Sequence, residues 1–125
     1  MEFIPGGSLD TLITSFGALS LSAVRRYLRD ILSGLNYLHV MKIVHCDVKP
    51  HNVLLAMDGL CKLSDFGCAL PVVRNKVIYI EDIGELRGTP SYLSPEVARG
   101  EVPSTKSDIF SLGVAVLEMI TGKLP

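Results

Sequence analysis

The sequence contains no tryptophan, few aromatic residues and no excess of charge. Its 125 residues include 12 Lys and Arg against 13 Asp and Glu, a formal net charge of −1, and no block of basic residues. Proteins that hold nucleic acid or anionic lipid by electrostatic attraction carry a basic patch, so we expect no nucleic-acid partner. The shares of hydrophobic residues (48%) and charged residues (20%) exclude disordered and collagen-like chains and predict one globular domain.

Cysteines are few, and long apolar runs are missing. Cys46, Cys61 and Cys68 are odd in number, lack the spacing of metal ligands and follow no signal peptide, which is typical of a reducing compartment. We therefore expect free thiols and a cytoplasmic protein, with the nucleus as a second location. The longest apolar stretch, residues 109–120, has polar interruptions and is too short to span a bilayer. No membrane segment is expected.

Two helices are predicted in the first third of the chain. An extended segment, residues 1–8, leads into a short helix over residues 9–16 that Gly17 ends. Ser20 or Ser22 can cap a second helix. Its apolar residues recur at spacings of three and four, which predicts one buried face; they are Val24, Tyr27, Leu28, Ile31, Leu32, Leu35 and Leu38.

Three short strands are predicted next. Strand-like pieces occur at residues 43–44, 53–55 and 61–63. The last two flank an Asp-Gly pair, which is a strong turn signal, so they should form a β-hairpin.

A long loop and one further helix are predicted in the remainder. Residues 68–99 show no sustained period, which is typical of a functional loop. Ser107 and Asp108 are predicted to begin a helix that runs to Thr121 and is closed by Gly122. Because this helix is apolar on nearly every side, we expect it to be buried all round.

The segment His-Cys-Asp-Val-Lys-Pro-His-Asn at residues 45–52, with Asp-Phe-Gly beyond the hairpin, carries the residue types that phosphoryl transfer needs. This reaction requires a carboxylate to orient the attacking hydroxyl, a cation beside the moving phosphoryl group and oxygen ligands for magnesium. Asp47 and Lys49 share one face of an extended loop because side chains alternate. Asn52 and Asp65 lie at opposite ends of the predicted hairpin, which would bring them together.

Any one of these residues alone reads as a solvated loop residue. Four fixed residues in the pattern His-x-Asp-x-Lys-x-x-Asn match by chance only about once in 10⁵ positions at an average usage of ~5% each. The combination therefore favours a catalytic site over a solvated loop.

With these residues the chain resembles the protein kinase family, whose catalytic loop reads His-Arg-Asp-Leu-Lys-x-x-Asn before Asp-Phe-Gly. Residues 88–96 are similar to the end of the activation segment, with Ser-Pro-Glu where Ala-Pro-Glu is usual. Asp108 matches the residue of a buried helix that anchors the catalytic loop. Lys49 with Thr89 is the serine/threonine pattern. The resemblance implies an α+β, protein-kinase-like fold over residues 1–125, from the hinge to the buried central helix of a mainly helical C-terminal lobe with a short β-hairpin.

The resemblance also implies the roles of individual residues. Asp47 and Lys49 would be catalytic, and Asn52 and Asp65 would hold Mg²⁺. The ATP site would use backbone groups of Glu2 and Ile4 for adenine, Ser8 near the ribose and Leu54 below the adenine. The implied cofactors are therefore ATP and Mg²⁺, and the implied reaction transfers the γ-phosphoryl group to Ser or Thr of a protein.

Finer features are similar to the MEKK-type MAP kinase kinase kinases of plants. These features are His-Cys-Asp, Asp-Phe-Gly-Cys-Ala and Arg-Gly-Thr-Pro followed by Pro-Glu-Val-Ala-Arg-Gly-Glu. They imply a MAP kinase kinase as the protein substrate. Cys46, however, replaces the Arg that pairs with a phosphate in most kinases, and between Asp65 and Arg87 only Tyr79 carries a hydroxyl. We therefore expect activity without phosphorylation ahead of Arg87.

Other parts of a kinase are not found in the sequence. No glycine-rich loop and no Val-Ala-Ile-Lys motif precedes the hinge-like residues, so the N-terminal lobe is expected to be absent and the chain alone inactive. Two alternatives remain open. One is a truncated, inactive fragment that serves as an interaction module for a kinase partner or scaffold. The other is a small-molecule phosphotransferase, which the protein-substrate motifs of residues 88–96 disfavour.

Overall fold

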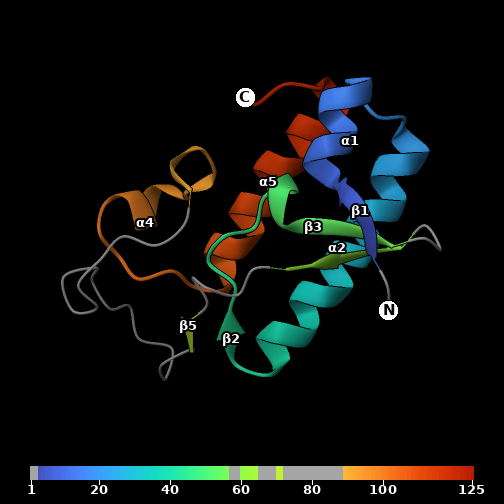
Figure 1. Ribbon diagram of the computed structural model, residues 1–125. Helices are drawn as coiled ribbons and strands as arrows, with labels where there is room; N and C mark the ends of the chain where they lie inside the picture. Colours follow the sequence, from blue (N-terminus) through green and yellow to red (C-terminus); the bar gives the residue numbers. More distant parts are fainter. Residues whose placement is uncertain (1–2, 57–59, 65–69, 72–88) are drawn as a thin grey trace.

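The computed structural model describes residues 3–56, 60–64, 70–71 and 89–125 (Figure 1). The α+β class expected from the sequence is confirmed. In chain order the elements are β1 (Phe3–Ser8), α1 (Leu9–Phe16), α2 (Leu21–Val40), β2 (Ile43–Val44), the 3-10 turn η1 (Pro50–Asn52), β3 (Val53–Ala56), β4 (Cys61–Leu63), β5 (Leu70–Pro71), the 3-10 turn η3 (Pro90–Tyr92), α4 (Pro95–Ala98) and α5 (Thr105–Thr121).

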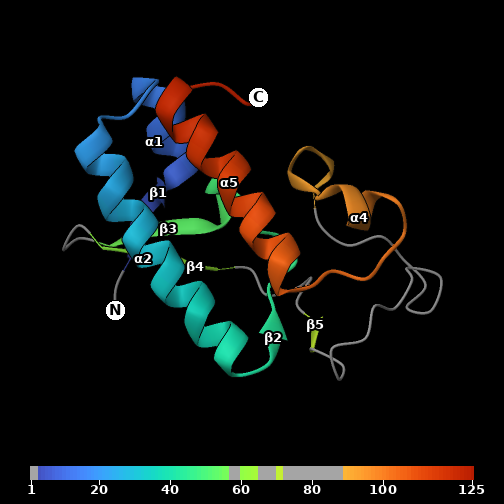
Figure 2. The same cartoon turned by 180° about the vertical axis from the view of Figure 1, so that it is seen from behind.

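Helices α2 and α5 lie side by side, as seen from behind in Figure 2. Their facing sides join α1 and the hairpin strands in one apolar core. Its members are almost fully buried; they include Leu9 and Ile13 of α1, Ile31 and Leu35 of α2, Leu112 and Met119 of α5, and Val48 and Val53. Residues 45–52, called the catalytic-loop segment below, therefore pack against this core through Val48.

The predicted helices α1 and α2 are confirmed, and their caps explain their ends. Ser20, rather than Ser22, caps α2, because its hydroxyl accepts a hydrogen bond from the amide of Ala23 at 3.2 Å. Gly17 ends α1 with a φ of 72°, a left-handed value that glycine adopts without steric cost.

The predicted start of the last helix was wrong by a few residues. Helix α5 begins at Thr105, and Ser104 is its N-cap. Ser104 Oγ accepts from the Ser107 amide at 3.3 Å, while Ser107 Oγ accepts from the Ser104 amide at 2.8 Å. This reciprocal capping box uses Ser107 as a partner inside the first turn.

The expectation that α5 is buried all round was also wrong. Leu112, Ala115 and Met119 are buried, whereas Ile109 and Leu117 are 49% and 50% exposed. In the described part of the chain, α5 packs mainly against α2, β2 and η3. These elements cover one side of the helix, so its opposite apolar side faces solvent.

The sheet confirms the predicted hairpin. Strands β3 and β4 pair antiparallel with Val53 opposite Leu63, and β1 adds to the other edge of β3, giving the order β1-β3-β4. The extended segment at the start of the chain is thus strand β1, whose register shifts between Phe3 and Ser8. The Asp-Gly turn lies outside the described residues.

The stretch 68–99 is not structureless, contrary to expectation. Strand β5 pairs antiparallel with β2, and η3 and α4 lie near its end. Cys46 and Cys61 are free thiols, as expected, while Cys68 lies outside the described residues. No described helix has the length and apolarity required to cross a bilayer.

Two Gly→Ala substitutions on α5 are expected to change stability in opposite directions. Gly122 has a φ of 79°, and a Cβ there would lie 2.6 Å from the Ala18 backbone nitrogen. We expect Gly122→Ala to lower the free energy of unfolding by about 2 kcal/mol or more. At Gly113 a Cβ meets nothing within 4 Å, so Gly113→Ala should raise it by about 0.5–1 kcal/mol. Urea unfolding measures both, and a loss of stability in Gly113→Ala would contradict the packing described for α5.

Candidate active site

The carboxylate of Asp108 holds the catalytic-loop segment in place. It lies in the first turn of α5 and is 1% exposed. Its Oδ2 accepts from the His45 amide at 2.8 Å, and its Oδ1 accepts from the Cys46 amide at 2.9 Å. The anchoring role that the sequence resemblance gave to Asp108 is therefore visible as two buried hydrogen bonds.

His39 makes a third contact with this carboxylate. Its Nε2 lies 2.8 Å from Asp108 Oδ2, so the end of α2 joins the same group. The sequence alone does not indicate this role of His39. Its only signal was a histidine in the last turn of a helix, and the partner is 69 residues away.

Cys46 adopts an uncommon backbone conformation beside this anchor. Its φ is 75°, in the left-handed region that a residue with a Cβ rarely occupies without support from its surroundings. The hydrogen bond from the Cys46 amide to Asp108 supplies part of that support. The turn at Cys46 separates β2 from the extended residues that carry Asp47 and Lys49.

His45 links the catalytic-loop segment to the hairpin. Its ring is fully buried, with Nε2 2.8 Å from the Ser64 carbonyl oxygen. Nδ1 accepts from the Asp47 amide at 3.1 Å. Because a carbonyl only accepts and an amide only donates, Nε2 is the donor and Nδ1 the acceptor in these two bonds. His45 belongs to the His-x-Asp-x-Lys-x-x-Asn motif, but the motif alone does not predict this link to the hairpin.

Asp47, Lys49 and Thr89 form one hydrogen-bonded group. The Lys49 ammonium donates to Thr89 Oγ1 at 2.7 Å, and the Thr89 hydroxyl donates to Asp47 Oδ1 at 2.7 Å. Lys49 Nζ lies 3.9 Å from Asp47 Oδ2. The predicted placement of Asp47 and Lys49 on one face is therefore confirmed, and Asp47 accepts a hydrogen bond from an alcohol group.

Asn52 has a geometry suited to an oxygen ligand. Its amide nitrogen donates to the carbonyl oxygen of Asp47 at 2.8 Å and to Asp47 Oδ2 at 3.2 Å. Both bonds are made by the amide nitrogen and not by the side-chain oxygen. The Asn52 carbonyl accepts from the Ser64 amide at 2.8 Å. The hairpin therefore brings Ser64, the residue before Asp65, back to Asn52.

Asp65 itself lies outside the described residues, so its proximity to Asn52 stays a prediction. An amide oxygen with a carboxylate is the donor set that Mg²⁺ prefers, and Asn52 fits such a site. Within the part of the chain that the structure describes, three or more His, Cys, Asp or Glu side chains nowhere gather as metal ligands.

The predicted nucleotide residues are placed in part. Strand pairing puts Ser8 of β1 opposite Leu54 of β3, so these two are brought together. The Ser8 hydroxyl accepts from the Thr11 amide at 3.1 Å and thereby caps α1. Ile4 lies in β1, and Glu2 lies outside the described residues. Contacts of these residues with ATP stay predictions.

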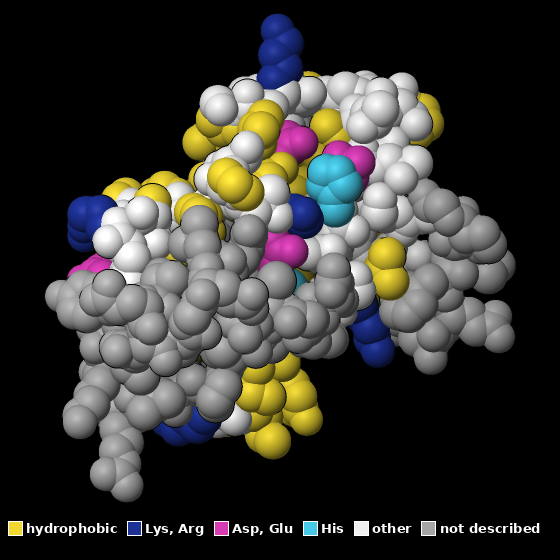
Figure 3. All heavy atoms as spheres, turned by 60° about the vertical axis from the view of Figure 1, so that its left-hand side comes forward, with side chains coloured by type: hydrophobic (Ala, Val, Ile, Leu, Met, Phe, Trp, Pro, Cys, Tyr) yellow, Lys and Arg dark blue, Asp and Glu magenta, His cyan; other side chains and the backbone are white. Residues whose placement is uncertain are grey.

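Charged groups also lie beside the catalytic-loop segment. His51 Nε2 is 3.1 Å from Asp10 Oδ2, joining η1 to the first turn of α1. Figure 3 shows a His side chain against an acidic one on an exposed face, with basic and further acidic groups near it.

Burial raises the pKa of Tyr92, as do its hydrogen bond to Glu118 and the charges of Glu118 and Asp10. Tyr92 is therefore a hydrogen-bond donor at every physiological pH.

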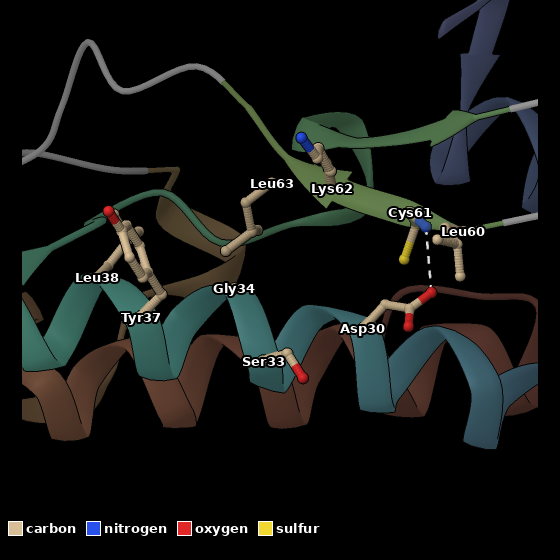
Figure 4. Close-up of a pocket in the computed structure, with 9 residues that line it drawn as sticks. All are labelled: Asp30, Ser33, Gly34, Tyr37, Leu38, Leu60, Cys61, Lys62 and Leu63. Atoms are coloured by element: carbon tan, nitrogen blue, oxygen red, sulfur yellow. Dashed lines mark hydrogen bonds between the residues drawn. The ribbon is translucent and has the colours of Figure 1, made fainter. Parts of the chain in front are cut away.

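A cavity of about 540 Å³ lies between α2 and β4 and is lined by none of Asp47, Lys49 or Asn52 (Figure 4). Leu63 points toward Gly34, and Asp30 Oδ2 accepts from the Cys61 amide at 3.1 Å. Burial, followed by the charge and hydrogen bond of Asp30, raises the pKa of the Cys61 thiol to about 12. This thiol is therefore chemically inert at neutral pH.

Comparisons with known proteins agree with this geometry. A family model described as the protein kinase domain matches residues 1–125. Mitogen-activated protein kinase kinase kinase 19 of Mus musculus is 43% identical over 127 residues, covering 100% of this chain and 10% of that protein. Mitogen-activated protein kinase kinase kinase 17 of Arabidopsis thaliana is 43% identical over 129 residues, covering 100% of this chain and 32% of that protein. The chain thus spans a third or less of the relatives it matches.

Removal of the Asp108 carboxylate is expected to damage the site more than removal of its side-chain partner. Asp108→Ala removes the acceptor of two buried hydrogen bonds, those from the His45 and Cys46 amides, which should cost about 3 kcal/mol or more of unfolding free energy. His39→Ala removes one partly exposed hydrogen bond and should cost about 1 kcal/mol. Chemical denaturation measures both losses, and equal losses would contradict the anchoring role of Asp108.

Cys61 is expected to resist thiol reagents in the folded protein. With a pKa of about 12, only about one thiol in 10⁴ is ionised at pH 8. Labelling with a chromogenic disulfide should therefore be equal for native wild type and native Cys61→Ala, and should differ by one thiol in denaturant. Lower labelling of the native variant would show that Cys61 is reactive.

The same thiol sets a pH dependence of stability. The unfolded thiol loses its proton from its ordinary value of 9.0, whereas the folded thiol keeps it until about 12. The folded state thus binds more protons between these values, so stability should fall as pH rises above about 9. Cys61→Ala should show a smaller fall.

Proposed function

The chain belongs to the protein kinase family, and from that premise we propose that it carries the catalytic loop of an ATP-dependent serine/threonine protein kinase of a MAP kinase cascade. The observation that carries the proposal is the group formed by Asp47, Lys49 and Thr89. It combines a carboxylate able to take up an alcohol proton with the Lys49 ammonium, which lies 3.9 Å from that carboxylate. These are the two charges that phosphoryl transfer to an alcohol requires.

In this proposal each residue acts on a different atom of the reaction. Asp47 accepts a hydrogen bond from the acceptor hydroxyl and takes its proton as the oxygen bonds to the γ-phosphorus of ATP. The bond from that phosphorus to the bridging oxygen breaks, and ADP leaves. Lys49 uses N–H groups not engaged by Thr89 to stabilise the negative charge of the moving phosphoryl group.

Magnesium and the nucleotide would be held by residues around this pair. Asn52 and Asp65 would bind Mg²⁺, which neutralises charge on the phosphates when bound. Ser8 and Leu54, paired across β1 and β3, would border the ribose and adenine, with backbone groups of Glu2 and Ile4 at the adenine edge. The hydrogen bonds of the Asn52 side chain to Asp47 use its amide nitrogen, so its oxygen is available as a ligand, which supports the metal role.

The names of the relatives support a substrate class. Mitogen-activated protein kinase kinase kinases act, by their name, on MAP kinase kinases. We propose a MAP kinase kinase as the protein substrate of this chain also. The free thiols of Cys46 and Cys61 support a cytoplasmic location, with the nucleus as a second one. Because the sequence has no glycine-rich loop to cover the phosphates, we expect little or no turnover by the 125 residues alone.

A chimaera tests this proposal in a complete kinase. Residues 1–125 would replace the matching 129 residues of mitogen-activated protein kinase kinase kinase 17 of Arabidopsis thaliana, and radioactive phosphate transfer to a MAP kinase kinase would be measured. The chimaera should be active. Asp47→Asn should lower kcat by about 10²- to 10⁴-fold, since it removes the proton acceptor. Thr89→Ser should keep most of the activity that Thr89→Ala loses.

Asp30→Asn is the matched control, because it makes the same chemical change at the cavity between α2 and β4 and retains an oxygen for the Cys61 amide. Its kcat should stay near that of the parent chimaera. A folded chimaera without activity, or full activity in Asp47→Asn, would refute the proposal. In a parallel assay, turnover by the 125-residue chain alone would refute the expectation of its inactivity.

A further inference from the structure

Ser94 has a buried hydroxyl without a partner in the described part of the chain. It precedes α4 and is 1% exposed. Its Oγ makes no hydrogen bond with any described residue, and it does not cap α4 although it occupies the N-cap position. Burial of an unpaired hydroxyl costs free energy, so such a group normally has a protein or water partner.

Ser94 lines a small cavity beside the catalytic-loop anchor. The cavity lies between the segment around Ser94 and the first two turns of α5, and Asp108, Ser107 and Ser111 also line it. About 10 Å³ is open to the centre of a water-sized sphere, which is close to what a single water molecule needs. The cavity is therefore too small for a metabolite. Hydroxyl and carboxylate groups line part of it, and Cys46, Leu93, Val97 and Pro103 line the rest.

Two of the lining side chains have hydrogen-bonding capacity left. The Asp108 carboxylate has about four acceptor positions, and three are used by His39, the His45 amide and the Cys46 amide. Two of these three bonds fall on Oδ2, so Oδ1 has the position that remains. Ser111 Oγ donates to the Tyr92 carbonyl at 2.6 Å, and its lone pairs can accept.

We propose that this cavity binds one ordered water molecule that bridges Ser94 and Asp108. The water accepts the hydroxyl proton of Ser94 and donates its own two protons to Asp108 Oδ1 and Ser111 Oγ. Every polar group then has a partner, and the carboxylate reaches its full complement of donors. This assignment does not rest on the proposed function, since it follows from burial, cavity size and hydrogen-bonding capacity.

The water adds a link from Ser94 to Asp108 beside the direct hydrogen bond from Ser111 to the Tyr92 carbonyl, which already ties the segment around Ser94 to α5. Ser94 stands at the end of the segment that begins with Thr89, the partner of Asp47 and Lys49. Asp108 holds the amides of His45 and Cys46 on the other side of the site. Ser94 is thus a positioning residue that acts on the catalytic loop through the water and Asp108.

Whether Ser94→Ala raises or lowers the unfolding equilibrium constant tests the proposed bridging water. If the Ser94 hydroxyl had no partner, Ser94→Ala would remove a buried polar group and lower the unfolding equilibrium constant. With the water in place, Ser94→Ala breaks a hydrogen bond and strands the water, so the constant should rise about five- to tenfold. Ser33→Ala, at an exposed serine of α2, is the control and should change it less than twofold.

A second measurement follows the catalytic-loop amide. In Ser94→Ala, hydrogen exchange of the Cys46 amide should accelerate, because its acceptor Asp108 loses the bridging water. The Met41 amide, which bonds to the Tyr37 carbonyl away from this cavity, should exchange at an unchanged rate. Equal exchange of Cys46 in the two proteins would overturn the coupling.

The proposed water can also be detected directly in the wild-type protein, without any substitution. Magnetisation transfer from a long-lived water to the Ser111 or Asp108 amide should be detected, and a high-resolution crystal structure should show a water within hydrogen-bond distance of Ser94 Oγ and Asp108 Oδ1. A higher stability of Ser94→Ala, or a cavity without such a water, would overturn the proposal.

Discussion

The site depends on one buried carboxylate. Asp108 lies in the first turn of α5. Its carboxylate contacts His39 at the end of α2 and accepts hydrogen bonds from the amides of His45 and Cys46, which follow β2. These amides belong to no helix or strand, so the Asp108 carboxylate takes the place of a secondary-structure acceptor for them. Loss of a buried backbone hydrogen bond is costly. The same bonds support the left-handed φ of Cys46. The direction in which the chain leaves this turn, and hence the place of Asp47, follows from the position of α5.

A second constraint fixes the other side of the catalytic loop. The β3–β4 hairpin returns Ser64 to the Asn52 backbone and to the buried His45 ring. Since the His45 ring in turn accepts from the Asp47 amide, the backbone of Asp47 is tied to the hairpin while its neighbours are tied to α5. An irregular loop is thereby held by hydrogen bonds on both sides, and fixed positions of this kind are what preorganised catalysis requires.

Local signals in the sequence were sufficient for part of this architecture. Helix α2 followed from its apolar spacing and a serine cap, and the hairpin followed from an Asp-Gly pair between two apolar runs. The shared face of Asp47 and Lys49 followed from the alternation of side chains. The short strand β5 gave no such signal, because its partner β2 is a two-residue piece far away in sequence. The roles of His39 and His45 were not predictable for the same reason, since each contacts a residue far away in sequence. The exposed side of α5 was not predictable from the composition of the helix, because exposure depends on which elements pack against it.

The contacts that hold the segment after Thr89 are mostly hydrogen bonds from neutral groups. Ser111 donates to the Tyr92 carbonyl, and the Tyr92 hydroxyl donates to Glu118. The ion pair of Arg99 with Glu101 is exposed and long at 3.8 Å, so it adds little. Bonds of neutral donors in a buried setting are screened only weakly by salt. Thr89 itself is held beside Asp47 by a charged group as well as a neutral one, because it accepts from the Lys49 ammonium while its own hydroxyl donates to Asp47. The cation next to Thr89 is therefore Lys49, and in the described part of the chain the residues that follow depend on hydroxyl donors.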